Sequence, residues 1–164
     1  MIRTPLTVLL LALVFLPGCD TNAGQDEFFL QARQPPDGVI TRTNESGEII
    51  GEPDPDDWRT APAFQGSVEV MPAAPNPVQR NELMTITVQD TFGDVLTGGV
   101  FVSGVDDNGL FVRLATDEGT GPFYSLTFNP TRLRIVGGDD ARFYRLRIFT
   151  NDSRIISYGD IQVR

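Results

Sequence analysis

The sequence predicts an all-β protein: one antiparallel β-sandwich of about seven strands, preceded by a signal peptide and an acidic, disordered tether. From Ser67 onward, runs rich in Val, Ile, Phe and Tyr alternate apolar with polar residues, which is the period of a half-buried strand. Gly, Asp, Asn and Pro separate these runs and predict turns. No window of about ten residues carries apolar side chains at helical spacing, so no helix is expected.

A signal peptide is expected over residues 1–18. Arg3 precedes an uncharged apolar run that covers residues 6–16. This run is too short for a helix that crosses a bilayer, which needs about 20 residues, but it has the usual length of a signal-peptide core. A short buried helix is a poorer interpretation, because the run is apolar on every side and is followed directly by Pro17 and Gly18.

The segment Leu16-Pro17-Gly18-Cys19 resembles the lipobox of bacterial lipoproteins. The resemblance implies that Cys19 carries a diacylglyceryl group in a thioether bond and becomes the new N-terminus. Two or three acyl chains anchor a protein stably, since each buried methylene contributes about 0.8 kcal/mol. The expected location is therefore a membrane of the cell envelope, with the outer membrane as the default. The alternative is that Cys19 is a small buried apolar side chain.

Residues 19–66 are expected to form an acidic, proline-rich tether. Residues 20–66 carry ten acidic residues against three arginines, whereas residues 67–164 carry twelve against nine. Like charges and prolines both oppose a compact fold. Within this segment, Val39–Thr43 and Glu48–Ile50 flank a four-residue turn and predict a short β-hairpin over residues 39–50. A lone hairpin is marginally stable, so this one would need to dock on the main domain.

The end of the tether carries three nearby carboxylates, Asp54, Asp56 and Asp57. They could serve as calcium ligands, but the glycine and the bidentate glutamate of a calcium loop are missing, so a solvated linker is favoured. Trp58 and Phe64 follow, and we expect them to mark the domain boundary by packing on the domain surface.

The domain itself is predicted to cover residues 67–164. Its apolar runs define each strand in turn, and each run ends at a turn signal. The expected strands contain Val68–Val70, Leu83–Val88, Val100–Val102, Leu110–Leu114, Tyr124–Phe128, Phe143–Phe149 and Ile155–Val163.

The segment Val70–Pro77, with its Pro-Asn-Pro turn, and the final aromatic and arginine-rich hairpin over residues 143–157 suggest a second resemblance. They are similar to C-terminal secretion sorting domains of the Bacteroidetes. The resemblance implies an immunoglobulin-like sandwich, and we take from it the fold rather than the secretion role.

Composition excludes several kinds of chemistry. The chain has no histidine, a single cysteine and, since all 13 basic residues are arginine, no lysine. Catalytic triads, lysine nucleophiles, zinc modules and internal disulfides are therefore excluded, and no cofactor or metal site is expected. The net charge of −9 argues against nucleic-acid binding, which needs a cationic surface.

Two sets of charged residues remain as candidates. The carboxylate pairs Asp106/Asp107, Asp117/Glu118 and Asp139/Asp140 each lie beside glycine, so we interpret them as turn formers rather than catalytic acids. The arginines could form a cationic strip for an anionic ligand, or pair with nearby acids, which we favour. Arg145 and Arg147 share one strand face by the period-two rule. The strip would contain Arg113, Arg132, Arg134, Arg145, Arg147 and Arg154.

The sequence thus predicts a lipid-anchored cell-envelope protein whose sandwich is a non-catalytic binding or structural module. Its expected partners are the membrane, through the acyl chains on Cys19, and one or more envelope proteins. The alternative is a sorting or accessory domain of a secretion system.

Overall fold

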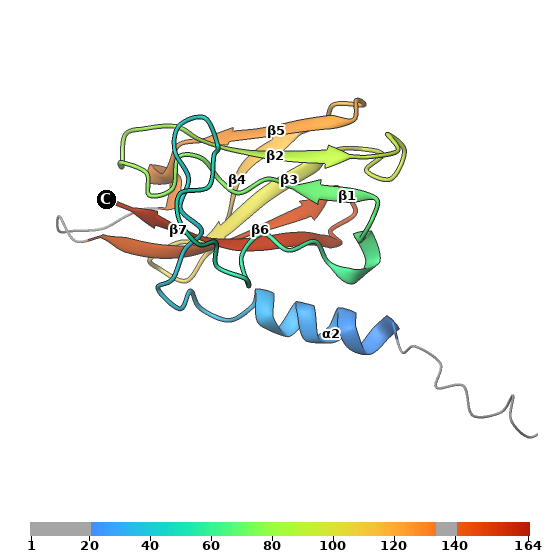
Figure 1. The fold of residues 1–164 in the computed structure, drawn as a ribbon, viewed down its shortest axis with the longest axis horizontal. Helices are drawn as coiled ribbons and strands as arrows, with labels where there is room; N and C mark the ends of the chain where they lie inside the picture. Colours follow the sequence, from blue (N-terminus) through green and yellow to red (C-terminus); the bar gives the residue numbers. More distant parts are fainter. Residues whose placement is uncertain (1–20, 134–140) are drawn as a thin grey trace, which may run out of the picture.

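The computed structural model describes residues 21–133 and 141–164 of the chain (Figure 1). The signal peptide and Cys19 lie outside the described residues, as do Arg134 and the Asp139/Asp140 pair. The elements are α2 (Thr21–Ala32), the 3-10 helices η2 (Pro62–Phe64) and η3 (Pro130–Leu133), and the strands β1 (Val68–Val70), β2 (Met84–Asp90), β3 (Val100–Val105), β4 (Phe111–Asp117), β5 (Phe123–Phe128), β6 (Arg142–Thr150) and β7 (Ile155–Val163).

The seven strands form two antiparallel sheets, which confirms the predicted β-sandwich. One sheet has the strand order β1-β2-β5 and the other has the order β4-β3-β6-β7. The two sheets lie face to face in Figure 1, and α2 runs along the outer side of the larger sheet. The pairing of β3 with β4 shifts between Val102 and Ser103, where β4 has one extra residue, Leu114.

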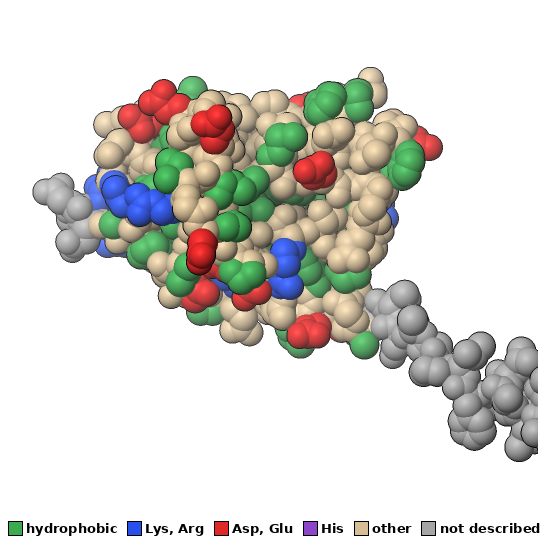
Figure 2. Space-filling model, viewed as in Figure 1, with side chains coloured by type: hydrophobic (Ala, Val, Ile, Leu, Met, Phe, Trp, Pro, Cys, Tyr) green, Lys and Arg blue, Asp and Glu red, His purple; other side chains and the backbone are tan. Residues whose placement is uncertain are grey.

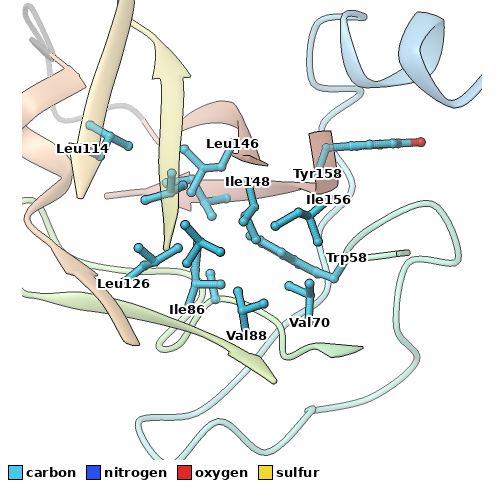
Figure 3. Packing of buried hydrophobic residues seen from close by; sticks show 14 of the residues in the cluster. Trp58, Val70, Ile86, Val88, Leu114, Leu126, Leu146, Ile148, Ile156 and Tyr158 are labelled. Carbon is cyan, nitrogen blue, oxygen red and sulfur yellow. The ribbon is translucent and has the colours of Figure 1, made fainter. Parts of the chain in front are cut away.

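The core lies between the sheets and is built from alternate residues of each strand. In β2 the buried residues are Met84, Ile86, Val88 and Asp90, while the residues between them are half-buried. In β6 the buried positions begin at Tyr144 and continue through Leu146 and Ile148. The labelled side chains of both sheets meet in Figure 3, whereas Tyr158 points away from them. This alternation leaves Arg145 and Arg147 together on the outer face of β6, as predicted.

The outer edge of β7 is covered by the segment just before the sandwich. The backbone N–H of Trp58 donates to the carbonyl of Tyr158 at 2.7 Å, and that of Ala61 donates to Ile156 at 2.7 Å. Since an open strand edge invites aggregation, this pairing protects the sheet. Trp58 and Phe64 are both buried in the core, so the expectation that they pack on the domain surface is wrong.

The structure also corrects the expected tether, because residues 21–66 pack against the sandwich. Phe28 and Ala32, one helical turn apart, bury the inner side of α2 in the hydrophobic core. The Phe28 ring lies 5.0 Å from that of Tyr158, which explains why Tyr158 points outward. The helix escaped prediction because its buried stripe is only these two residues long, with the partly buried Phe29 beside it.

The predicted hairpin exists as a narrow turn that docks on the sandwich. Thr43 bridges Ile49 across the turn and bridges Asn76 on the other side. Asn76 is fully buried, and its amide donates to the carbonyls of Thr41 and Asp160 at 3.0 Å. The N–H of Gln162 donates to the Asn76 side-chain oxygen, also at 3.0 Å. One buried amide therefore ties the hairpin to β7.

Candidate functional site

The candidate site lies beside α2, on the outer face of the larger sheet. Two arginines of β6 hold the C-terminal end of this helix. Arg145 Nη1 donates to the carbonyl of Gln31 at 2.9 Å, and Arg147 Nε donates to that of Ala32 at 2.6 Å. Cationic side chains at a helix C-terminus donate hydrogen bonds to the last carbonyls, which have no partner within the helix. They also interact favourably with the helix dipole. These bonds fix the position of the helix over the sheet.

A groove of about 330 Å³ opens between this end of α2 and the sheet. Phenylalanines from β3, β4 and β6 form its floor. Phe101 stacks on Phe149 with ring centroids 5.1 Å apart, and Phe111 meets Phe149 edge-on at 5.9 Å. We call it the arginine–aromatic groove and define it by Phe29, Arg33, Phe101, Phe111, Arg147 and Phe149.

Arginines surround this aromatic floor. The guanidinium carbon of Arg113 lies 3.8 Å from the centre of the Phe101 ring, and that of Arg147 lies 5.7 Å from the Phe111 ring, both within cation–π range. Arg113 and Arg147 occupy neighbouring positions across the sheet, since both are register partners of Ser103. Arg33 follows α2 on the helix side of the groove.

The groove is locally cationic in an acidic protein. Burial lowers the pKa of the Arg147 guanidinium, and the positive charges of Arg145 and Arg33 lower it further. Among residues 21–133 and 141–164, no carboxylate forms an ion pair with Arg33, Arg113 or Arg147. Figure 2 shows one face of the molecule, on which acidic side chains are scattered and arginines gather in small groups. The three guanidinium groups are thus available to an external anion.

No family model, curated protein or solved structure matches this chain. The function of the groove is therefore inferred from its geometry. In the part of the chain that the structure describes, no helix has the length and apolar character needed to cross a membrane. The same residues contain no group of three acidic, Cys or His side chains placed to hold a metal ion.

Of the described carboxylate pairs singled out in the sequence, Asp106 and Asp117 accept backbone hydrogen bonds at turns, whereas Asp107 pairs with Arg142. Asp106 Oδ1 accepts the N–H groups of Asn108 and Leu110 at 2.9 and 2.8 Å. Asp117 accepts those of Gly119 and Ser125, both at 2.8 Å. These carboxylates satisfy backbone donors within their own loops. The pair Asp139/Asp140 lies outside the described residues.

The arginines of the expected strip have different roles. Arg145 makes a bidentate ion pair with Asp160, in which Nε and Nη2 donate at 2.7 and 2.8 Å. Arg154 pairs with Asp152 at 2.9 Å, and Arg132 donates to the carbonyl of Leu114. Pairing with nearby acids, as favoured, therefore holds for Arg145 and Arg154, whereas Arg132 binds a backbone carbonyl. Arg147 instead lines the groove, Arg113 stacks on Phe101 of its floor, and Arg134 lies outside the described residues.

The acidic cluster at Asp54, Asp56 and Asp57 is structural. Asp57 is buried, and its two oxygens accept the N–H groups of Thr41 at 2.8 Å and Asp160 at 2.7 Å. Burial raises the pKa of Asp57 to about 7, and the charges of Asp160 and Asp54 add to this, while the two backbone hydrogen bonds oppose it. Asp57 thus joins the hairpin to β7 rather than forming part of a solvated linker.

A larger hollow of about 640 Å³ lies between the hairpin and the smaller sheet. Its lining includes Glu45, Glu82, Met71 and Leu83. The threonine hydroxyl of Thr85 at its floor is already bonded to Thr127 at 2.9 Å. No set of charges converges here on an apolar surface, so the arginine–aromatic groove is the stronger candidate.

Sequence reasoning found Arg113 and Arg147 but missed the rest of the groove. Phe29 and Arg33 belong to a segment that was expected to be a tether. Phe101, Phe111 and Phe149 were taken as strand residues, with nothing to show that three separate strands bring them together. A usable signal was present, because each phenylalanine lies two positions from an arginine or a serine on the same strand face.

Proposed function

We propose that the chain is a lipid-anchored protein of the cell envelope, in the outer membrane by default, and that its sandwich is a non-catalytic binding module. The observation that supports the binding role is the arginine–aromatic groove. There three guanidinium groups, none paired with a carboxylate of the described residues, lie at an aromatic floor in which Phe111 is exposed. Binding sites between proteins are enriched in this combination of arginine and aromatic side chains.

The anchor is proposed from residues 1–19 of the sequence. A short apolar run followed by Leu16-Pro17-Gly18-Cys19 supports acylation of Cys19. The described helix begins at Thr21, so only Asp20 separates the acylated residue from an element that packs on the sandwich. The partner is proposed to be a protein of the same envelope.

The non-catalytic assignment is supported by what the charged residues do. The chain has no histidine and no lysine, which leaves carboxylates as the principal general acids or bases. The carboxylates of Asp57, Asp106 and Asp117 all accept backbone hydrogen bonds that maintain the fold. The groove residues are arginine and phenylalanine, which bind and orient rather than transfer protons.

Acylation is tested by metabolic labelling. The full-length protein, expressed with its own residues 1–18, should incorporate labelled palmitate and partition into the detergent phase. The Cys19→Ala variant should lose both properties. A Cys19→Ala protein that still carries the label would exclude the lipoprotein assignment.

The binding face is tested separately by site-specific photo-crosslinking in intact envelopes. A photoreactive residue in place of the exposed Phe111 should form a crosslinked adduct, whereas the same residue in place of Phe92, which is exposed outside the groove, should not. Equal crosslinking at both positions would show that the groove is not a specific interface.

The alternative is a secretion sorting domain, favoured by the resemblance of residues 70–77 and of the last hairpin. A sorting domain is removed after translocation, whereas an anchored module keeps its last strand. Intact-mass measurement on the protein from native membranes separates the two. A mature species that ends at Arg164 and is acylated at Cys19 supports the anchored module, and a mature species without residues 67–164 supports sorting.

A further inference from the structure

We infer that the arginine–aromatic groove binds a short acidic segment of a partner protein, with a carboxylate between Arg33 and Arg147 and a neighbouring apolar side chain on Phe111 and Phe149. This inference rests on the proposed binding function and specifies its ligand. It follows from the charge, the free donors and the apolar floor of the groove.

Free hydrogen-bond donors converge on the groove. Arg147 uses Nε to bind Ala32, and its two terminal nitrogens have no partner among the described residues. The side chain of Arg33 likewise makes no hydrogen bond there. A guanidinium group carries five N–H donors in a planar fork that matches the two oxygens of a carboxylate. Two such forks in the lining of one groove favour a ligand that carries carboxylates.

The apolar floor requires a second feature of the ligand. Phe111 is 53% exposed, although it lies on a strand and contacts Phe149 edge-on. An aromatic or aliphatic side chain laid against these rings would remove apolar surface from water. The ligand therefore places an apolar group directly beside its carboxylate, as an acidic peptide with interspersed apolar residues does.

An unpaired hydroxyl lies under the same surface. Ser103 stands between Arg113 and Arg147 in the row across the sheet, and its hydroxyl is fully buried without a hydrogen-bond partner among the described residues. Buried polar groups in native proteins nearly always have a partner. Ser103 does not line the groove, so its hydroxyl lies beneath the surface on which the ligand is proposed to bind.

The groove also continues in a direction that suits an extended chain. A second hollow of about 360 Å³ adjoins it and shares Arg33 and Arg147. Its walls include Pro35, Pro36, Tyr144 and two carboxylates, Asp106 and Asp107, of which Asp107 is paired with Arg142. The two hollows together form a track with the arginine pair at its middle, which accommodates several residues of an extended peptide better than a compact small molecule.

Other anionic partners fit less well. A nucleic acid or an anionic bilayer presents many negative charges at once, and the net charge of −9 on this chain repels such surfaces outside the groove. An acidic sugar chain needs hydroxyl and amide partners, whereas the lining of the groove is phenylalanine, arginine and a single serine, Ser153, besides aliphatic residues. A short peptide confines its charge to the groove.

The experiment measures binding of a fluorescein-labelled ten-residue peptide, in which glutamate alternates irregularly with phenylalanine and leucine between glycine-serine ends, by fluorescence anisotropy. Two control peptides replace every glutamate by glutamine or every apolar residue by serine. The protein variants are Arg33→Gln, Arg113→Gln and Phe111→Ser, whose side chains make no hydrogen bond that maintains the described fold. Arg42→Gln is the matched control, because it removes one exposed positive charge outside the groove.

The expected result is saturable binding of the acidic apolar peptide alone, weakened at least tenfold by Arg33→Gln and by Phe111→Ser, and unchanged by Arg42→Gln. Arg113→Gln should weaken it less, since this guanidinium group already stacks on Phe101.

Equal binding of the glutamine peptide, equal loss in Arg42→Gln, or preferential binding of phosphatidylglycerol vesicles or a uronate oligosaccharide would overturn the inference. So would self-association of the wild-type chain that Arg33→Gln abolishes. A specific crosslink at position 111 without peptide binding would reject the ligand class and leave the proposed binding face intact.

Discussion

At the scale of single residues, Trp58 and Gly159 depend on each other. Trp58 has a backbone φ of 60°, an uncommon left-handed conformation for a bulky residue. Its ring lies directly over Gly159, where an added β-carbon would come within 2.3 Å of the indole. The absence of a side chain at Gly159 thus allows the indole to reach the core across β7.

We predict that Gly159→Ala displaces the indole and lowers the free energy of unfolding by about 1–3 kcal/mol, the usual cost of overpacking a core. Urea unfolding followed by the fluorescence of Trp58, the only tryptophan, measures both effects. The emission of the native variant should shift to longer wavelength. Gly121→Ala is the control, because its added β-carbon meets nothing closer than 4.0 Å. Equal stability of the two variants would contradict the prediction.

The raised pKa of Asp57 predicts how the free energy of unfolding depends on pH. Its pKa rises from an ordinary value of 3.8 to about 7 in the folded chain, mainly through burial. The folded state therefore binds a proton more tightly than the unfolded state. This contribution to stability is fully present below about pH 4 and is lost as the pH rises towards 7. The difference corresponds to about 4 kcal/mol as an upper limit.

The measurement is the free energy of unfolding in urea between pH 5 and pH 8. The wild type should lose stability over this range, and Asp57→Asn should show a smaller slope. Neighbouring charges enter the comparison, since Asp160 and Asp54 face Asp57 and Arg145 pairs with Asp160. Identical slopes for the two proteins would show that Asp57 does not cause the pH dependence.

At the scale of elements, a buried aromatic side chain and two arginine hydrogen bonds hold α2 on the sandwich. Phe28 is its large buried side chain, and Arg145 and Arg147 bind its last carbonyls. Phe28→Ala should lower the free energy of unfolding of the helix-docked state by about 3–5 kcal/mol. Limited proteolysis should then cut first between residues 21 and 40.

The wild type and Leu30→Ala, which changes a residue that is 63% exposed, should resist cleavage in this region. Rapid cleavage of the wild type between residues 33 and 57 would mean that α2 and the hairpin detach readily and that the segment behaves as a tether after all.

The elements also show how far the sequence could be interpreted. The strands were predictable because buried and less buried residues alternate along a half-buried strand, so its apolar and polar residues alternate in the sequence. Met84–Asp90 shows this pattern. The helix was not, because its described buried residues, Phe28 and Ala32, form only a short stripe. Much of its further support comes from β6 and β7, over 100 residues away. The groove was only partly predictable, since its phenylalanines meet through the order β4-β3-β6, which no local pattern reveals.

At the scale of the whole molecule, uncompensated negative charge opposes the compact state. The chain carries a net charge of −9. Residues 21–66, which have nine acidic residues against three arginines, lie against the sandwich instead of extending away from it. Salt screens such repulsion, because the Debye length falls from about 30 Å at 0.01 M to about 10 Å at 0.1 M ionic strength.

We therefore predict that the midpoint of urea unfolding rises between 0.01 and 0.2 M sodium chloride at pH 7. Affinity of the groove for an acidic peptide should fall over the same range, because that interaction is an attraction between opposite charges. A midpoint that falls with salt would show that ion pairs such as Arg145–Asp160 outweigh the net repulsion.

With the anchor proposed at Cys19, the packing of α2 also determines how far the sandwich can travel from the membrane. A flexible chain of the length of residues 20–66 would span about 40 Å on average and let the sandwich sample a wide shell of space. With α2 docked, Asp20 is the only residue between an acylated Cys19 and a helix fixed to the sandwich. The groove would then stand at a nearly constant height above the lipid, facing one thin layer of the envelope. A partner segment presented in that layer would meet the groove at high effective concentration, and one held farther away would not meet it at all.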